Sequence, residues 1–402
     1  MSKLIPDIFA LIIKELDNDY NTLFRCLLVN KLWCKLTIPI LWKDCLSHNS
    51  KPISHEKNIS LIKILFSFLS EESKNLLIMN EINLSFIQTQ TPLFNYISYC
   101  KSIITFDVTE VIKNCFESPL SQNQKNIIDE EFYDMVFDKC SYLNRLGIFH
   151  KLCYKKYDMV NFMKLKDNLS NLVELTCTQY IDERIFYNLA EICVNIKKLE
   201  LRETLTLGYS TKTMDGLHLV KLPKLLKLRV CHLTEVKELI QNTSGYLKTI
   251  DIHNQFAKKN ITEDIIQIVI AIYQNCPKLE HLCIPFVDTI DDALGDLLVH
   301  CNQLEYIQIY GGFPSDESLN GDVILKILSK STSKKLERIE MKGSWKFSVD
   351  PLKEFLNDLK ERNYSLYFKF GLNYDCLNEE FSSIIQNFVD DNVLRINPLD
   401  YL

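Results

Sequence analysis

A short pattern of alternating hydrophobic and polar positions recurs along the chain from about residue 140. Clear copies read LPKLLKLRV at 222–230, CPKLEHLCI at 276–284 and CNQLEYIQI at 301–309, and a weaker copy, CKSIITFDV, lies at 100–108. Successive copies share an apolar anchor, separated by 22 to 32 residues, at Leu143, Leu172, Ile196, Leu225, Leu247, Leu279, Leu304 and Leu336. The alternation predicts one short strand in each copy, with one face buried.

The second half of each unit has helical periodicity. Thr262 is a candidate N-cap, and Ile265, Ile268 and Ile272 follow it at helical spacing. The segments 182–192 and 291–298 repeat this arrangement. A unit of one strand and one helix cannot bury both apolar faces alone, so the units are expected to stack.

These features resemble the leucine-rich repeat family, particularly its cysteine-containing subclass, and the segment ITEDIIQIVIAIYQNCPKLEHLCI at 261–284 is the best match within the chain. The resemblance implies an α/β fold: a curved solenoid with parallel strands on its concave face and helices on its convex face. The irregular spacing of the anchors departs from the most regular members of that family.

Strand alternation places the residues between the anchors on the concave side. Both signs of charge occur there among aromatic residues, which suits recognition of a protein surface better than recognition of a polyanion. Each residue taken singly also fits an ordinary solvated position, so the candidate substrate-binding site is the row as a whole. The row contains Arg145, Glu174, Lys198, Glu200, Arg202, Lys227, Arg229, Asp251, His253, His281, Tyr306, Gln308, Tyr310, Arg338 and Glu340.

Residues 4–46 lack the repeat and predict three short helices. The first begins at Pro6, the second contains Leu23 and Cys26, and the third runs from about Asn30 until Pro39 stops it. A unit of about 40 residues buries a low fraction of its surface, so some of its apolar stripe must cover a neighbouring domain or a partner. On patterning alone, an N-terminal cap of the solenoid is an equal alternative.

The order and spacing of residues in this segment resemble an F-box. The matching residues are Leu4-Ile5-Pro6-Asp7-Ile8-Phe9, Ile12, Leu16, Leu23, Cys26, Leu28-Val29-Asn30-Lys31, Trp33 and Leu41-Trp42, with Asn30 where the family usually has cysteine. The resemblance implies the substrate receptor of an SCF-type ubiquitin ligase. The F-box would dock on the Skp adaptor, which hangs from a cullin scaffold, and the repeats would hold an unknown target protein. The implied adaptor contacts are Ile5, Pro6, Ile8, Phe9, Ile12, Leu28, Val29, Trp33, Leu41 and Trp42.

The expected organisation has four parts. Residues 1–46 form the F-box, 47–99 a helical linker or degenerate first repeat, 100–342 the leucine-rich repeats, and 343–402 the last repeat and a C-terminal cap. Within the second and fourth parts, helices are predicted at 59–70, 351–362 and 376–389, and a strand at 366–370.

Composition and motifs narrow the function classes. A net charge of −6 argues against a nucleic-acid binder, and no apolar run reaches the length of a signal sequence or a membrane helix. We therefore expect an uncleaved N-terminus and a cytoplasmic or nuclear protein, or one present in both. The fourteen cysteines never form C-x-x-C, which favours reduced thiols.

No catalytic motif is evident, so we predict a non-catalytic subunit with no cofactor. Gly311-Gly312 is not followed by Lys-Ser/Thr, and phosphate binding is therefore not indicated. We also predict no metal site, because the His281 and Cys283 pair alternates along one strand and does not converge as C-x-x-C does. The alternative to a ligase receptor is a stand-alone repeat scaffold.

Overall fold

The structure is a computed structural model. It describes residues 6–17, 19–46, 55–87, 92–105, 109, 111–112, 115–116, 119–148, 166–178, 188–189, 191–202, 222–230, 236–253, 262–287, 289–311, 319–330, 335–370 and 379–396. The chain divides into two compact units, residues 1–196 and 197–402, and each is described by itself. None of the helices within these ranges is long and apolar enough to span a lipid bilayer.

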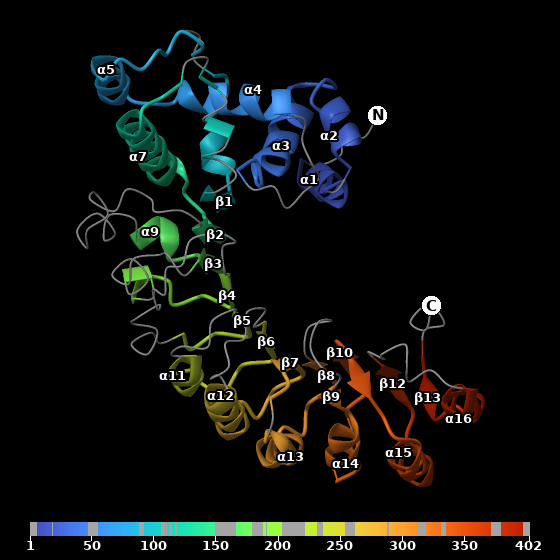
Figure 1. Ribbon diagram of the computed structural model, residues 1–402. Helices are drawn as coiled ribbons and strands as arrows, with labels where there is room; N and C mark the ends of the chain where they lie inside the picture. The colour runs from blue at the N-terminus through green and yellow to red at the C-terminus, as the bar shows by residue number, and fades with distance from the viewer. Residues whose placement is uncertain are drawn as a thin grey trace. The chain divides into compact units, whose positions relative to one another are not determined.

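Three helices begin the first unit: α1 (Pro6–Glu15), α2 (Tyr20–Cys26) and α3 (Lys31–Trp42) (Figure 1). Polar side chains cap two of them. Asp19 accepts a hydrogen bond from the backbone N–H of Thr22, and Asn30 accepts from those of Leu32 and Trp33. Asn30, which departs from the F-box pattern, therefore defines the start of α3.

The prediction that Pro39 ends the third helix is wrong, because α3 continues through Pro39 to Trp42. A proline removes one backbone donor, and packing must compensate for the lost hydrogen bond. Ile38 is buried beside it, and Trp42 stacks on Tyr96 with ring centroids 4.2 Å apart. These contacts hold the last turn of α3 in place.

The rest of the first unit joins helices to three parallel strands. The helices are α4 (His55–Phe66), α5 (Glu71–Met79), the 3₁₀ turn η1 (Tyr96–Tyr99), α7 (Gln122–Lys139) and α9 (Lys166–Leu169). The strands β1 (Ser102–Ile104), β2 (Arg145–Ile148) and β3 (Glu174–Thr178) pair in sequence order. A parallel bridge between Leu46 and Ile103 ties the end of the helical segment to β1. The helix expected at 59–70 is α4, which ends at Phe66.

The second unit repeats strand and helix with regularity. Its strands are β4 (Lys198–Arg202), β5 (Lys227–Val230), β6 (Thr249–Ile252), β7 (His281–Pro285), β8 (Tyr306–Tyr310), β10 (Arg338–Lys342), β12 (Leu366–Lys369) and β13 (Leu394–Arg395). Neighbours in this order pair in parallel, and the series is open. A separate short pair joins β9 (Leu319–Asn320) and β11 (Trp345–Lys346).

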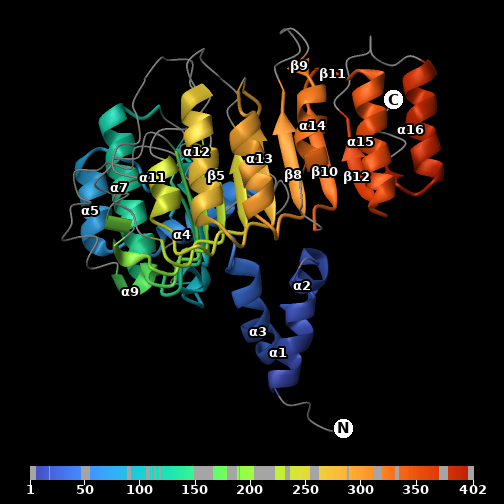
Figure 2. The same cartoon turned by 90° about the horizontal axis from the view of Figure 1, so that it is seen from below.

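Helices cover one face of this sheet. They are α11 (Val236–Gln241), α12 (Thr262–Asn275), α13 (Asp291–His300), α14 (Asp322–Lys330), α15 (Val349–Glu361) and α16 (Glu379–Asp390) (Figure 2). Between the helices and the strands lie the repeat anchors Leu225, Leu247, Leu279, Leu304 and Leu336, all buried. The sheet therefore has one packed face and one face turned away from the helices, which we call the open face.

The predicted α/β class is confirmed. Eleven parallel strands, three in the first unit and eight in the second, alternate with helices in the described parts of the chain. Each of the nine repeat copies contains its predicted strand. The predicted helices at 351–362 and 376–389 correspond to α15 and α16, and the strand at 366–370 is β12. The helix expected at 182–192 lies mostly outside the described residues.

Candidate functional site

The three N-terminal helices expose an apolar surface. Large hydrophobic side chains are exposed on α1, on α2, in the turn after α2 and at the start of α3. We call this set the helical apolar surface; it consists of Ile8, Leu11, Ile12, Phe24, Leu28, Val29 and Leu32. Leu28 is the most exposed of them at 88%, followed by Leu11 at 64%. Beneath them, Ile13, Leu23 and Cys26 are buried and hold the helices together.

The structure separates the predicted adaptor contacts into groups. Ile8, Ile12, Leu28 and Val29 are exposed, as an external contact requires. Ile5 lies outside the described residues, and only the backbone of Pro6, which opens α1, is described.

The remaining predicted adaptor contacts are half-buried and partly engaged inside the unit. Phe9 packs against Trp33 with ring centroids 5.5 Å apart, and Trp42 stacks on Tyr96. Leu41 is also half-buried. Sequence reasoning missed Leu11, Phe24 and Leu32, although Leu11 lies three residues after Ile8 and therefore shares its helical face.

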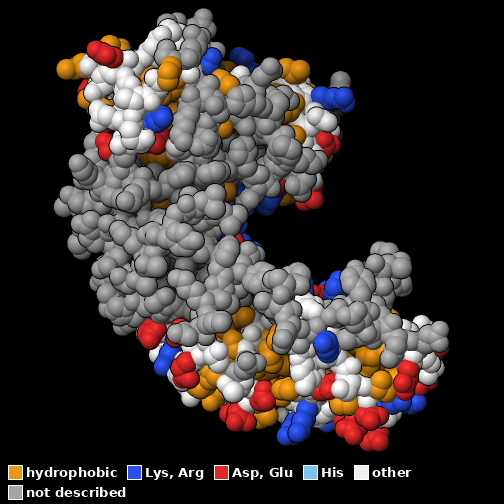
Figure 3. Space-filling view, in the orientation of Figure 1, with side chains coloured by type: hydrophobic (Ala, Val, Ile, Leu, Met, Phe, Trp, Pro, Cys, Tyr) orange, Lys and Arg blue, Asp and Glu red, His pale blue; other side chains and the backbone are white. Residues whose placement is uncertain are grey.

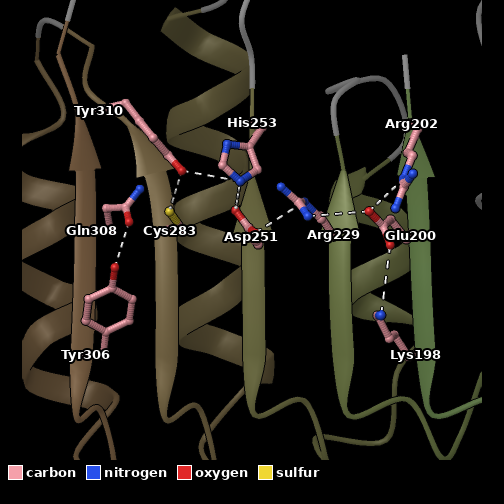
Figure 4. Close-up of polar contacts among 10 residues, drawn as sticks. All are labelled: Lys198, Glu200, Arg202, Arg229, Asp251, His253, Cys283, Tyr306, Gln308 and Tyr310. Carbon is pink, nitrogen blue, oxygen red and sulfur yellow. Dashed lines mark hydrogen bonds and ion pairs between the residues drawn. The ribbon is translucent and has the colours of Figure 1, made fainter. Parts of the chain in front are cut away.

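Strand register places the predicted substrate-binding residues of the second unit in rows across the open face. The first row runs Lys198, Lys227, Thr249, His281, Tyr306, Arg338, Tyr367 and Arg395. The second runs Glu200, Arg229, Asp251, Cys283, Gln308, Glu340 and Lys369. Figure 4 shows ten side chains of this face in front of the strands. The parallel register therefore brings residues from consecutive repeats side by side, although they are 22 or more residues apart in the sequence.

A buried carboxylate organises the face at β4 and β5. The Glu200 side chain is 5% exposed and accepts a hydrogen bond from Arg202 Nε at 2.8 Å (Figure 4). Arg229 Nη1 lies 3.4 Å from the same oxygen, and Lys198 Nζ lies 4.0 Å from the other. A buried charge needs partners of opposite sign, and these three cations supply them. The face is thus pre-ordered here, with half-exposed guanidinium groups at its surface.

Four side chains converge farther along the face, between β6 and β8. Asp251 Oδ1 lies 2.6 Å from His253 Nε2, and the Tyr310 hydroxyl lies 3.3 Å from the same nitrogen (Figure 4). The Cys283 thiol donates to the Tyr310 hydroxyl at 3.1 Å. Burial raises the pKa of the Cys283 thiol to about 12 and raises the pKa of Tyr310 as well. Both groups are therefore protonated at neutral pH.

Aromatic and guanidinium groups dominate the face at β8 and β10. The Tyr306 hydroxyl donates to Gln308 Oε1 at 2.6 Å, and Arg338 Nε donates to the buried Glu340 at 2.9 Å. The Arg338 guanidinium also lies over the rings of Tyr306 and Tyr367, at 5.5 and 4.6 Å from their centroids. Tyrosine and arginine are enriched among residues that dominate protein–protein binding energy.

The other predicted row members have different surroundings. Arg145 of β2 forms an ion pair with Asp44, so it ties the strand to the segment after α3. Glu174 is half-buried at the start of β3, while Lys227 and His281 are exposed. On the helical side of the second unit, Figure 3 shows Lys and Arg interspersed with Asp and Glu.

The chain matches no protein-family model, and no curated protein shows significant sequence similarity to it.

Proposed function

We propose that this protein is the substrate-recognition subunit of an SCF-type ubiquitin ligase. In this proposal the helical apolar surface docks on a Skp adaptor, and through it on a cullin scaffold. The open face binds a target protein for ubiquitination. The observation that carries the proposal is the exposure of Ile8, Ile12, Leu28 and Val29, on helices whose residue order resembles an F-box.

Exposure distinguishes adaptor docking from a purely capping role. A cap buries its apolar stripe against the array, so its large hydrophobic side chains lose contact with water. Here Ile8, Leu11 and Ile12 form one face of α1 and are exposed within the first unit. A cluster of exposed hydrophobic groups is typical of a protein-binding surface. This arrangement favours docking over capping.

The repeats support a substrate-receptor function through their fold and their open face. Parallel strands that alternate with helices on one face fit a leucine-rich-repeat solenoid, in which the open face would be concave. That face combines exposed arginines, half-buried tyrosines and buried carboxylates from several neighbouring repeats. This mixture suits a protein ligand. In the proposal, catalysis belongs to other subunits of a cytoplasmic or nuclear complex. This chain supplies proximity and orientation.

Docking of the helical apolar surface on the adaptor is tested by co-purification of the full chain with a Skp adaptor. We expect the wild type to bind and the Ile8→Asp/Leu28→Asp double variant to lose binding, because charge would be placed in an apolar interface. Both side chains are exposed, so the variant should fold. The matched control is Leu93→Asp, an equally exposed leucine outside α1–α3. Failure of the wild type to bind would leave the stand-alone scaffold as the better account.

Binding of a target protein by the open face is tested by affinity purification with the proteasome blocked. Proteins held by the open face should be enriched with the wild type and lost with Tyr306→Ala/Arg338→Ala, while adaptor binding stays unchanged. A set of captured proteins identical for both chains would contradict target binding through this face.

A further inference from the structure

Three potential metal ligands converge on the open face from two neighbouring strands. Asp251 of β6 lies directly opposite Cys283 of β7 in the parallel register, and His253 follows β6 two residues after Asp251. One carboxylate oxygen, one imidazole nitrogen and one sulfur all lie within 4.8 Å of one another (Figure 4). The convergence arises across the strands, because paired residues of adjacent strands are about 4.8 Å apart.

The Asp251 carboxylate is oriented toward this cluster. Arg229 Nε lies 3.4 Å from Oδ2, which leaves Oδ1 facing His253. Oδ1 is buried and lies 2.6 Å from His253 Nε2, so the carboxylate and the imidazole already face each other. A buried carboxylate oxygen is unfavourable unless a proton or a cation compensates its charge.

We propose that Asp251, His253 and Cys283 bind one Zn²⁺ ion. Sulfur and imidazole nitrogen are ligands of zinc, whereas Ca²⁺ and Mg²⁺ take oxygen ligands. A thiolate and a carboxylate together neutralise the two charges of the ion, and a neutral imidazole completes the set. Binding replaces the proton of the Cys283 thiol with the metal and releases that proton to solvent.

The distances are compatible with one ion after small side-chain rotations. Zinc bonds of about 2.0–2.3 Å in tetrahedral geometry separate neighbouring ligand atoms by roughly 3.3–3.6 Å. The oxygen and nitrogen at 2.6 Å would move apart, and pairs near the 4.8 Å limit would close by about 1 Å. All three side chains are on the open face, so the fourth coordination position is available there, beside the Tyr310 hydroxyl.

A structural zinc site has four protein ligands, whereas this site supplies three and leaves the fourth coordination position open. A metal here would cross-link β6 to β7 and present a positively charged coordination position on the open face. A donor side chain of a bound protein, or water, would fill that position. This inference does not depend on the ligase proposal, because it concerns the chain's own residues.

The test uses Co²⁺ as a spectroscopic substitute for Zn²⁺ on the full-length chain. A thiolate bonded to Co²⁺ gives a near-ultraviolet charge-transfer band, and a four-coordinate ion gives intense visible bands. We expect both bands to saturate at one Co²⁺ per chain and to vanish when one equivalent of Zn²⁺ is added. Zinc should also raise the melting temperature, since a ligand that binds only the folded state stabilises it.

Variants locate the site among the chain's fourteen cysteines. Cys283→Ala should abolish the charge-transfer band, and His253→Gln should weaken Co²⁺ binding by at least tenfold. The controls Cys276→Ala and His300→Gln change a cysteine and a histidine outside the cluster and should leave the titration unchanged. Absence of the band in the folded wild type, or its persistence in Cys283→Ala, would overturn the proposal.

Discussion

Leu28 offers a quantitative test of the helical apolar surface. It is 88% exposed in the turn between α2 and α3, so Leu28→Ala removes little packing and should change the free energy of unfolding by no more than about 0.5 kcal/mol. If the adaptor buries the side chain, the variant loses three carbon atoms of buried apolar surface, or about 2 kcal/mol at ~0.8 kcal/mol per carbon. That loss corresponds to a roughly 30-fold increase in Kd.

The assay is calorimetric titration of a purified Skp adaptor into the full-length chain. Leu93→Ala is the matched control, because Leu93 is 83% exposed but lies outside the three helices. We expect the Kd of Leu93→Ala to equal that of the wild type. Equal Kd values for Leu28→Ala and the wild type would refute burial of Leu28 at the adaptor interface.

Two further predictions concern the repeats. Gly311→Ala should destabilise the fold by about 1–3 kcal/mol, because its Cβ would lie 2.8 Å from the fully buried ring of Trp345. A Cβ added at Gly295 in α13 meets no atom within 4 Å, so Gly295→Ala should instead stabilise the fold by roughly 0.5–1 kcal/mol. Urea unfolding measures both changes in the free energy of unfolding. Equal effects of the two substitutions would contradict this packing. Burial raises the pKa of the Cys276 thiol from 9.0 to about 12. The buried, protonated thiol therefore contributes fully to stability below pH 9, and this contribution is lost as pH rises toward 12. Over this range the free energy of unfolding falls by up to about 1.4 kcal/mol per pH unit. Urea midpoints between pH 8 and 11 should fall less steeply in Cys276→Ala, and parallel curves for the two proteins would contradict the raised pKa.

The strands and their two faces could be predicted from the sequence. Period-two alternation decides which side of a strand each residue occupies, and stacking of repeats then makes the register nearly uniform. Tyr306 and Arg338, 32 residues apart in the sequence, are paired in the structure for this reason. The spacing of apolar residues likewise predicted which face of each repeat helix is buried.

The end of α3 was mispredicted, because local propensity was outweighed by packing. A proline is expected to stop a helix, but Ile38 is buried beside Pro39 and Trp42 stacks on Tyr96, more than 50 residues away in sequence. No local pattern could reveal that contact. The exposure of Phe24 and Leu32 was not predicted either, because the small size of the unit indicates that some apolar side chains are exposed but not which ones.

The cluster of Asp251, His253 and Cys283 shows a more specific limit of sequence reasoning. The sequence prediction considered only the spacing of His281 and Cys283 along one strand. Convergence depends instead on the partner strand, where Asp251 lies opposite Cys283 although 32 residues separate them. In a repeat protein, motifs should therefore be searched between consecutive copies as well as within each one.

Docking of the helical apolar surface on the adaptor is measured by the mass of the complex that the full-length chain forms with a purified Skp adaptor. Size-exclusion chromatography with light scattering measures that mass at equimolar, micromolar concentrations. We expect a one-to-one complex for the wild type and separate components for Ile8→Asp/Leu28→Asp. Separate components for the folded wild type would contradict its assignment as a ligase receptor.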